Sequence, residues 1–302
     1  MPNCLGILKH SNASKMKSRI MVVLLMCAIS HYGYTQCKSI TVESVSNYTA
    51  IAIDSLYEAD GLRNGADYDG ATLYYPNNKK NKKLKSIVLV PGYKATQRSV
   101  SLWARYLAER GYVTMTIGTN ILTDSPALRA KALIDGMETI RQEDKRKGSP
   151  LFKKLDTKSI AVGGWSMGGG GAQLAAKLDG SIKAVIAITP WLYPRNLEAS
   201  NLDHSVPVLI LSGQIDPTAP PKSHSDVHYD YTPATTKKML FEVKEGNHST
   251  PLFPSTGNGD LGNVAYAWLG MYLEGNGCYA EMLSANSLNQ NSTASKHQAN
   301  LN

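Results

Sequence analysis

The segment Gly164-Trp-Ser-Met-Gly168 has the G-x-S-x-G spacing of a nucleophilic serine held in a sharp turn. The apolar stretch Ile160–Val162 precedes it and predicts a strand, while a helical pattern over Met167–Leu178 follows it. A strand–turn–helix arrangement exposes the hydroxyl of Ser166 for attack on a carbonyl carbon. A purely structural helix is the weaker interpretation, because each glycine in the run 168–171 costs a helix about 1 kcal/mol relative to alanine.

A nucleophilic serine needs a histidine as its base and a carboxylate that orients the histidine. When the nucleophile follows a strand in this way, the acid and then the base follow later strands along the chain. Asp216 comes just after the apolar stretch Val208–Leu211, and His248 comes after Met239–Val243. The sequence therefore predicts Ser166, Asp216 and His248 as a catalytic triad.

Other residues of the same types compete for these roles, namely Asp203, His204, His224 and His228. None of the three histidines directly follows a predicted strand. Asp203 precedes its strand, so it would lie at the wrong edge of the sheet. A single histidine in a loop is most often merely solvated, and we therefore favour Asp216 and His248.

Attack on a carbonyl also requires N–H donors that bind the developing oxyanion. The amide that follows the nucleophile, that of Met167, is the first expected donor. The second should come from a loop after an earlier strand, and Pro91-Gly-Tyr93 follows the apolar stretch Ile87–Val90. We expect Tyr93 to supply this amide, with Gly92 allowing the backbone to approach closely. An ordinary turn is the alternative interpretation of this loop.

The segment between the strand ending at Ile188 and the strand starting near Val206 has only seventeen residues. This length leaves no room for a helical cap, so the serine should open onto a shallow cleft. Trp165, Trp191 and Tyr93 would border that cleft. Aromatic residues there could simply pack against one another, but they also suit flat, apolar acyl groups.

These side chains must be positioned by alternating strands and helices. The expected strands are Thr49–Ile53, Ala71–Tyr75, Ile87–Val90, Tyr112–Ile117, Ser159–Val162, Ile182–Ile188, Val206–Leu211 and Lys238–Val243. The expected helices are Ser99–Arg110, Ala127–Lys147, Met167–Leu178 and Val264–Leu273. Apolar strands separated by helices predict an α/β fold, with a mostly parallel central sheet flanked by helices and no cap domain.

Composition divides the chain into three parts. Residues 1–36 have the basic, apolar and polar order of a secretory signal, with Met16 as an alternative start. Residues 37–283 form the expected catalytic domain. Residues 284–302 are rich in Asn, Ser and Gln, which predicts a disordered tail.

The net charge of +8 is weak evidence for a nucleic-acid partner. Removal of the first 36 residues leaves 28 basic and 24 acidic residues, a net charge of +4. Cys37 and Cys278 would be the two cysteines of the exported chain, and they could form one disulfide in an oxidising compartment. No spacing of histidines and cysteines suggests a metal site, and no glycine-rich phosphate loop is present.

From about Ile87 to Leu273 the sequence resembles the bacterial cutinases and poly(ethylene terephthalate) hydrolases, which belong to the dienelactone-hydrolase-like branch of the α/β-hydrolase fold. The segments that carry the resemblance are Pro91-Gly-Tyr-Lys-Ala-Thr-Gln97, Ile117-Gly-Thr-Asn120, Gly164-Trp-Ser-Met-Gly-Gly-Gly-Gly171 and Thr189-Pro-Trp191. The resemblance implies the triad and the oxyanion donors named above, and Trp191 as an aromatic clamp on the acyl ring. Trp165, where many cutinases have histidine, is similar to the dedicated polyester-cleaving enzymes.

The sequence also departs from the family. The best-known plastic-degrading member carries a cysteine pair beside the acid and base loops, where this chain has Gly213 and Thr250. His224 matches the cutinases rather than the small serine proposed to free the clamp tryptophan. Thr218 replaces an apolar residue that usually lines the cleft. We expect Thr218 and His224 to contact substrate together with Tyr93, Trp165 and Trp191.

The sequence thus predicts a secreted serine ester hydrolase that cleaves polyesters and short-chain esters through an acyl-enzyme, without a cofactor or metal. The expected partner is an ester or polyester substrate, with no nucleic acid and no stable membrane anchoring, and the expected state is a monomer. The alternative within the class is a general carboxylesterase or lipase-like enzyme for soluble or lipid esters. Outside it, an acyltransferase or a catalytically inactive binding protein on the same fold remains open.

Overall fold

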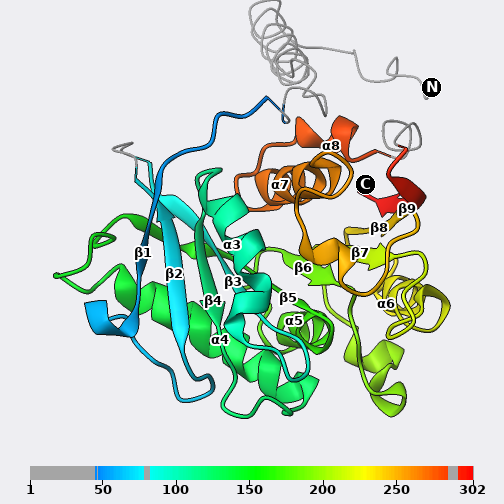
Figure 1. Ribbon diagram of the computed structural model, residues 1–302, viewed down its shortest axis with the longest axis horizontal. Coiled ribbons are helices and arrows are strands. Elements are labelled where there is room, and N and C mark those ends of the chain that lie inside the picture. The colour runs from blue at the N-terminus through cyan, green and yellow to red at the C-terminus, as the bar shows by residue number, and fades with distance from the viewer. Residues whose placement is uncertain (1–44, 46, 78–81, 285–291, 302) are drawn as a thin grey trace, which may run out of the picture. The chain divides into compact units, whose positions relative to one another are not determined.

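The computed structural model describes residues 45, 47–77, 82–284 and 292–301, all within one compact unit, Thr41–Asn302. Nine strands form a single sheet in the order β1-β2-β4-β3-β5-β6-β7-β8-β9 (Figure 1). The strands are β1 Ile53–Leu56, β2 Ala71–Pro76, β3 Leu84–Val90, β4 Val113–Ile117, β5 Leu155–Trp165, β6 Val185–Ile188, β7 Val208–Gly213, β8 Lys238–Val243 and β9 Ala294–Asn300. The six strands from β4 to β8 in this order are parallel, whereas β1, β2 and β9 at the two edges pair antiparallel with their neighbours. This confirms the predicted mostly parallel α/β sheet.

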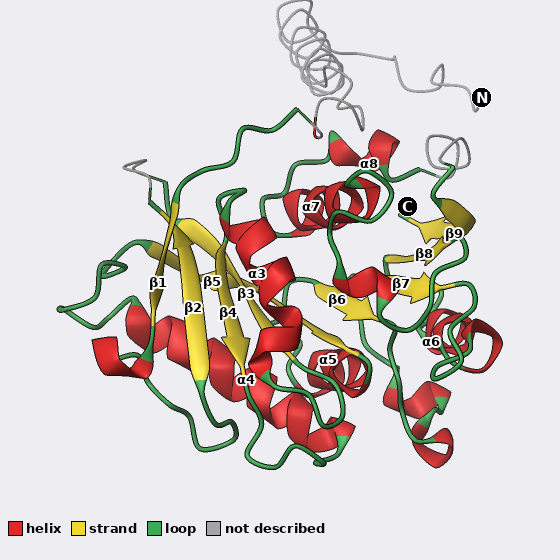
Figure 2. Ribbon diagram, in the orientation of Figure 1, coloured by secondary structure: helices red, strands yellow, loops and turns green. Residues whose placement is uncertain are grey.

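Helices cover both faces of the sheet (Figure 2). They are α3 Ser101–Ala108, α4 Pro126–Glu143, α5 Met167–Leu178, α6 Ser225–Tyr231, α7 Asp260–Tyr272 and α8 Tyr279–Met282. Six short 3₁₀ helices complete the described helices: η1 Glu58–Asp60, η2 Gln97–Val100, η3 Pro194–Asn196, η4 Ala199–Asn201, η5 Pro221–Ser223 and η6 Thr250–Leu252. α3 contacts α7 on one face, and α4 packs against α5 on the other. The segment between β6 and β7 holds only η3 and η4, so the cleft has no cap there.

Burial explains why the central strands could be identified from composition. Every residue of β4, β6, β7 and β8 is buried, which is typical of parallel strands with helices on both sides. The boundaries of α4 also follow from local chemistry. The Ser125 hydroxyl accepts a hydrogen bond from the Leu128 amide at 3.3 Å, and Pro126 occupies the first helical position.

The first predicted strand is shifted. Only Ile53 of the segment Thr49–Ile53 belongs to β1. The preceding residues bond elsewhere, since the Ile51 amide donates to Glu109 O at 2.8 Å, at the end of α3. The helix α6 was not predicted, because its seven residues are too few to give a clear period.

The prediction of a disordered tail over residues 284–302 is wrong for residues 294–300. These residues form β9, which pairs antiparallel with β8 from Lys238↔Asn300 to Val243↔Ala294. The polar composition led to the wrong prediction because an edge strand is held by backbone pairing, and its side chains need little burial. Lys296 adds an ion pair with Asp226, at 2.8 Å between Nζ and Oδ1.

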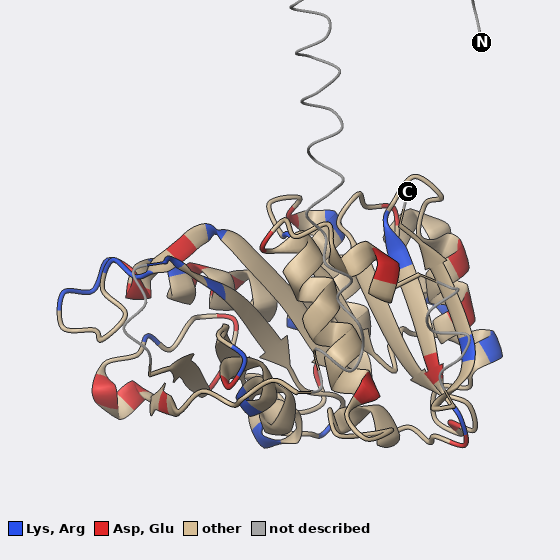
Figure 3. Ribbon diagram, turned by 90° about the horizontal axis from the view of Figure 1, so that it is seen from above, with Lys and Arg blue, Asp and Glu red and all other residues tan. Residues whose placement is uncertain are grey.

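Charged residues of both signs are interspersed along the described chain (Figure 3). The predicted signal at residues 1–36 and the cysteine Cys37 lie outside the described residues, so the signal and the Cys37–Cys278 bridge stay predictions. Among the residues that the structure describes, no helix is both long and apolar enough to cross a membrane.

Candidate active site

Ser166 lies between the end of β5 at Trp165 and the start of α5 at Met167. Its backbone has φ 58° and ψ −120°, a strained conformation for a residue with a side chain. The flanking glycines make this turn possible. A Cβ on Gly168 would lie 2.5 Å from the carbonyl oxygen of Pro91, and one on Gly164 would lie 2.6 Å from the carbonyl oxygen of Gly168. The turn therefore has the geometry of a nucleophile elbow.

Asp216 and His248 lie on the loops after β7 and β8 and contact each other. The His248 Nδ1 is 2.6 Å from Asp216 Oδ2, and the carboxylate is almost completely buried. The other oxygen, Oδ1, accepts hydrogen bonds from the amides of Thr218 at 2.8 Å and Ala219 at 2.9 Å. Burial alone would raise the pKa of Asp216, but these hydrogen bonds and the imidazole outweigh it and hold the pKa below its ordinary value.

The absence of a side chain at Gly213 allows these two loops to approach each other. The Ile215 amide donates to Gly246 O at 2.9 Å, which joins the acid loop to the base loop. A Cβ on Gly213 would lie 2.4 Å from the carbonyl oxygen of Asn247. Gly213 is therefore required for the close approach that places Asp216 beside His248.

Trp165 ties the base loop to the end of β5. Its indole Nε1 donates to His248 O at 3.0 Å, and the two rings lie 5.2 Å apart. The Thr189 hydroxyl donates to the same carbonyl at 3.4 Å. The base loop is thus fixed next to the residue that directly precedes Ser166.

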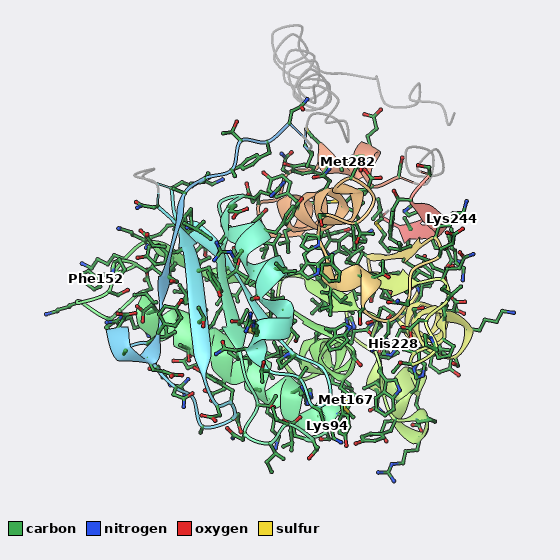
Figure 4. The ribbon with its side chains drawn as sticks, in the orientation of Figure 1. Lys94, Phe152, Met167, His228, Lys244 and Met282 are labelled. Carbon is green, nitrogen blue, oxygen red and sulfur yellow. The ribbon has the colours of Figure 1, made fainter. Side chains whose placement is uncertain are left out.

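The two expected oxyanion donors lie near the serine. Met167 begins α5, and a Cβ on Gly92 would lie 3.0 Å from the Ser166 Cβ, which shows how closely the loop after β3 approaches. Neither the Met167 amide nor the Tyr93 amide donates a hydrogen bond to another described residue. Met167 and Lys94, which follows Tyr93, lie at the same end of the sheet in Figure 4.

An open cleft of about 320 Å³ adjoins the serine and has mostly apolar walls. Its lining residues are Tyr93, Ser166, Met167, Trp191, Tyr193 and Thr218. Trp165 and His224, also predicted to bind substrate, do not line it. Trp165 packs against His248, and His224 stacks on Trp191 with ring centroids 6.1 Å apart.

Tyr193 is the lining residue that the sequence analysis missed. Its ring meets Trp191 edge-on, with centroids 4.9 Å apart and planes at 73°. Trp191 therefore contacts two aromatic rings, those of Tyr193 and His224. An aromatic residue two positions after Trp191, in the loop that follows β6, was the signal available in the sequence.

Three of the four competing residues, Asp203, His204 and His228, lie elsewhere. Asp203 and His204 line a separate cavity beside Lys177 and Thr236. His228 is completely buried in α6, where its Nδ1 contacts Gln173, and burial lowers its pKa to about 3. No cluster of three or more His, Cys, Asp or Glu side chains within the described ranges could hold a metal ion.

Comparison with known proteins identifies the family of the chain. A family model described as PET hydrolase-like matches residues 38–301. The chain belongs to the PETase family. This membership makes it a carboxylic-ester hydrolase and confirms the α/β-hydrolase fold. The match also includes nearly all of the segment that composition assigned to a disordered tail.

Curated relatives of this PETase-family chain have ester-cleaving activities in their names. Cutinase est1 of Thermobifida alba is 33% identical over 230 residues, which cover 76% of this chain and 74% of the relative. Bis(hydroxyethyl) terephthalate hydrolase of Streptomyces coelicolor is 31% identical over 216 residues, 72% of this chain and 66% of the relative. Cutinase 2 of Thermobifida cellulosilytica is 31% identical over 230 residues, 76% of this chain and 83% of the relative.

Proposed function

We propose that the chain cleaves the ester bonds of polyesters and of short esters, with Ser166, His248 and Asp216 as its catalytic triad. His248 Nδ1 donates to Asp216, which leaves Nε2 as the basic nitrogen. Nε2 takes the proton of Ser166 as the serine oxygen attacks the ester carbonyl carbon. The protonated imidazole then gives this proton to the leaving alcohol, and an acyl-enzyme remains.

Water completes the cycle. His248 accepts a proton from the water as it attacks the acyl carbon, and returns that proton to Ser166 when the carboxylic acid product leaves. Asp216 holds the imidazole in the required tautomer and stabilises its charged form. The amides of Tyr93 and Met167 bind the oxyanion in both steps, and each such donor is worth about 10²–10³ in kcat. No step needs a cofactor.

The walls of the cleft favour an aromatic acyl group. Tyr93, Trp191 and Tyr193 offer ring faces and edges to a flat unit, and Thr218 supplies one hydroxyl. A volume of about 320 Å³ is at the low end of small-molecule sites, which span about 300–1,000 Å³. The cleft therefore takes one acyl unit and leaves the rest of a longer substrate outside.

The edge of the sheet around the cleft favours contact with a solid polymer. Large apolar side chains are exposed there on the loops after β4, β7 and β8, including Ile121, Ile215 and Phe253. Ile121 and Ile215 are each 62% exposed. Exposed apolar side chains of this kind are more stable in contact with an apolar surface than in water. Together with the signal-like residues 1–36, this supports an exported enzyme that acts on extracellular polyester.

The observation that carries the proposal is the contact between Asp216 and His248, on a loop that is bonded to the residue before the strained Ser166. The test is mass-spectrometric detection of acids and alcohols released from polyester film by the wild-type protein and by Ser166→Ala. We expect release by the wild type and loss of at least about 10³-fold in Ser166→Ala. Ser181 is an exposed serine before β6. Its substitution Ser181→Ala is the matched control and should keep full activity.

A panel of p-nitrophenyl esters separates the polymer from soluble substrates. Cleavage of short esters without any product from film would contradict the polyester assignment and favour a general carboxylesterase. If an added alcohol captured most of the acyl group, the enzyme would be an acyltransferase instead. Equal activity of Ser166→Ala and wild type would overturn the triad.

A further inference from the structure

The guanidinium of Arg129 lies beneath the loop that carries Tyr93, and the side chain is completely buried. Arg129 belongs to the first turn of α4, and the proposed triad makes no use of it. Its Nη1 donates to Pro91 O at 2.6 Å and to Gly92 O at 2.9 Å. Its Nη2 donates to Leu122 O at 3.1 Å, and its Nε forms an ion pair with Asp124 Oδ1 at 2.8 Å.

The bond to Gly92 O determines where the Tyr93 amide points. The carbonyl of Gly92 and the N–H of Tyr93 belong to one planar peptide group, and in a trans peptide they point in opposite directions. The structure describes no cis peptide bond. The Arg129 guanidinium donates to Gly92 O from beneath the loop. The Tyr93 N–H therefore points away from the guanidinium.

The next peptide is held through the same arginine. The Lys94 amide donates to Leu122 O at 2.8 Å, and this carbonyl is also the acceptor for Arg129 Nη2. Both peptide planes that flank Tyr93 are thus fixed to one guanidinium, directly on one side and through Leu122 on the other. Rotation of either plane would break a hydrogen bond inside the protein.

Packing of α4 against α5 puts the guanidinium in this position. A Cβ on Gly171 of α5 would lie 2.9 Å from the Arg129 Cβ, so only glycine lets the two helices approach this closely. The glycine run after the nucleophile therefore has two structural roles. It forms the elbow, and it leaves space for the Arg129 side chain between α4 and α5.

Charge gives the contact an electrostatic effect as well. Carbonyl oxygens that accept hydrogen bonds from a cation are polarised, and the N–H of the same peptide becomes a stronger donor. The ion pair with Asp124 compensates the buried charge of Arg129. The guanidinium thus acts on the Tyr93 amide without touching substrate.

We propose that Arg129 is a positioning residue that holds and polarises the Gly92–Tyr93 peptide as the second oxyanion donor. This inference rests on the proposed ester hydrolysis. Because an oxyanion forms only during reaction, loss of the residue should lower kcat and leave KM nearly unchanged. A merely structural arginine would lower stability and leave the kcat of the folded enzyme intact.

The experiment compares Arg129→Lys and Arg129→Met with Arg63→Lys, each assayed on a soluble p-nitrophenyl ester below its own melting temperature. Arg63 is a matched control because it also binds α4, through an ion pair with Asp135 at 2.6 Å, far along the helix from the loop. We expect kcat to fall about 10-fold in Arg129→Lys and about 100-fold in Arg129→Met, with KM within about twofold. Arg63→Lys should lose stability only.

A boronic acid that forms a tetrahedral adduct with the serine gives a second readout. Its inhibition constant should rise in parallel with the loss of kcat/KM in the Arg129 variants and stay constant in Arg63→Lys. If Arg129→Met does not fold, Asp124→Asn tests the same geometry, since it removes the carboxylate that orients the guanidinium. Wild-type kcat in the folded Arg129→Lys protein would overturn the proposal. Ser166→Ala, measured in parallel, separates this failure from failure of the triad.

Discussion

Single side chains in the cleft decide which acyl groups fit. Trp191 contacts the edge-on ring of Tyr193 and the stacked ring of His224, so two aromatic neighbours restrict its orientation. Tyr193 also faces the cleft itself. We therefore propose that Tyr193 contributes to substrate binding both directly and through its contact with Trp191.

Tyr193→Ala should raise KM for an aromatic ester by about 2–10-fold, which corresponds to the loss of one aromatic pair of about 0.5–1.5 kcal/mol. The kcat should change little, because the ring supplies no acid, base or oxyanion donor to the reaction. The measurement compares p-nitrophenyl benzoate with p-nitrophenyl butyrate. Tyr193→Phe keeps the ring and should behave as wild type, and Tyr231→Ala on α6 is the surface control. An equal effect on both esters would show that Tyr193 does not select aromatic groups.

Gly213 shows that a position can match a family's cysteine and still be unsuitable for one. The double variant Gly213→Cys/Thr250→Cys should not gain stability, because a Cβ at position 213 comes 2.4 Å from Asn247 O. Gly213→Ala alone should lower the free energy of unfolding by about 1–3 kcal/mol, the usual effect of overpacking.

Urea unfolding measures this difference. Gly180→Ala is the control, since a Cβ there meets no atom within 4 Å. A stabilised double-cysteine variant would mean that the acid and base loops can separate to admit the new side chain.

At the scale of elements, the sequence was sufficient wherever burial or local spacing determines structure. The apolar strands β3, β7 and β8 and the helix α5 could be identified because they are buried, and the order of Ser166, Asp216 and His248 follows the order of β5, β7 and β8. Contacts between distant segments could not be predicted. In the sequence, Arg129 looks like an ordinary helix residue. Nothing in the adjacent residues indicates that its side chain reaches the carbonyl of Gly92.

The edge strand β9 is the clearest element that composition concealed. Deletion of residues 292–302 removes its pairing with β8 and exposes the unpaired edge of that strand. We expect a melting temperature lower by several degrees, since about 1 kcal/mol shifts it by about 2–4 °C in a domain of this size. Differential scanning fluorimetry and light scattering measure the loss and the accompanying aggregation.

Lys296→Ala removes only the ion pair with Asp226 and should cause a much smaller shift. A truncated protein that melts at the wild-type temperature and stays monodisperse would show that β9 adds nothing to the sheet.

Over the whole molecule, buried histidines link stability to pH. Burial lowers the pKa of His204 to about 4 and that of His228 to about 3, from 6.5 in an unfolded chain. Between about pH 4 and 6.5 the unfolded chain therefore binds protons that the native protein does not, so the free energy of unfolding rises with pH. The contribution of these two histidines to the free energy of unfolding is complete above pH 6.5 and is lost as the pH falls below it.

Each such histidine should contribute a slope of at most about 1.4 kcal/mol per pH unit. Urea unfolding at a series of pH values between 4.5 and 7.5 measures that slope. His204→Gln should make the slope smaller, whatever it does to stability at neutral pH. An unchanged slope would mean that His204 has the same pKa in the native protein as in the unfolded chain.

The separation of β8 and β9 along the chain has a consequence for folding during synthesis. β8 is complete some fifty residues before its last neighbour exists, because β9 begins at Ala294 and β8 ends at Val243. While the segment between them is being synthesised, the central strands can assemble but the β8 edge of the sheet stays unpaired. The last strand of the sheet can therefore be added only after the core has had time to form.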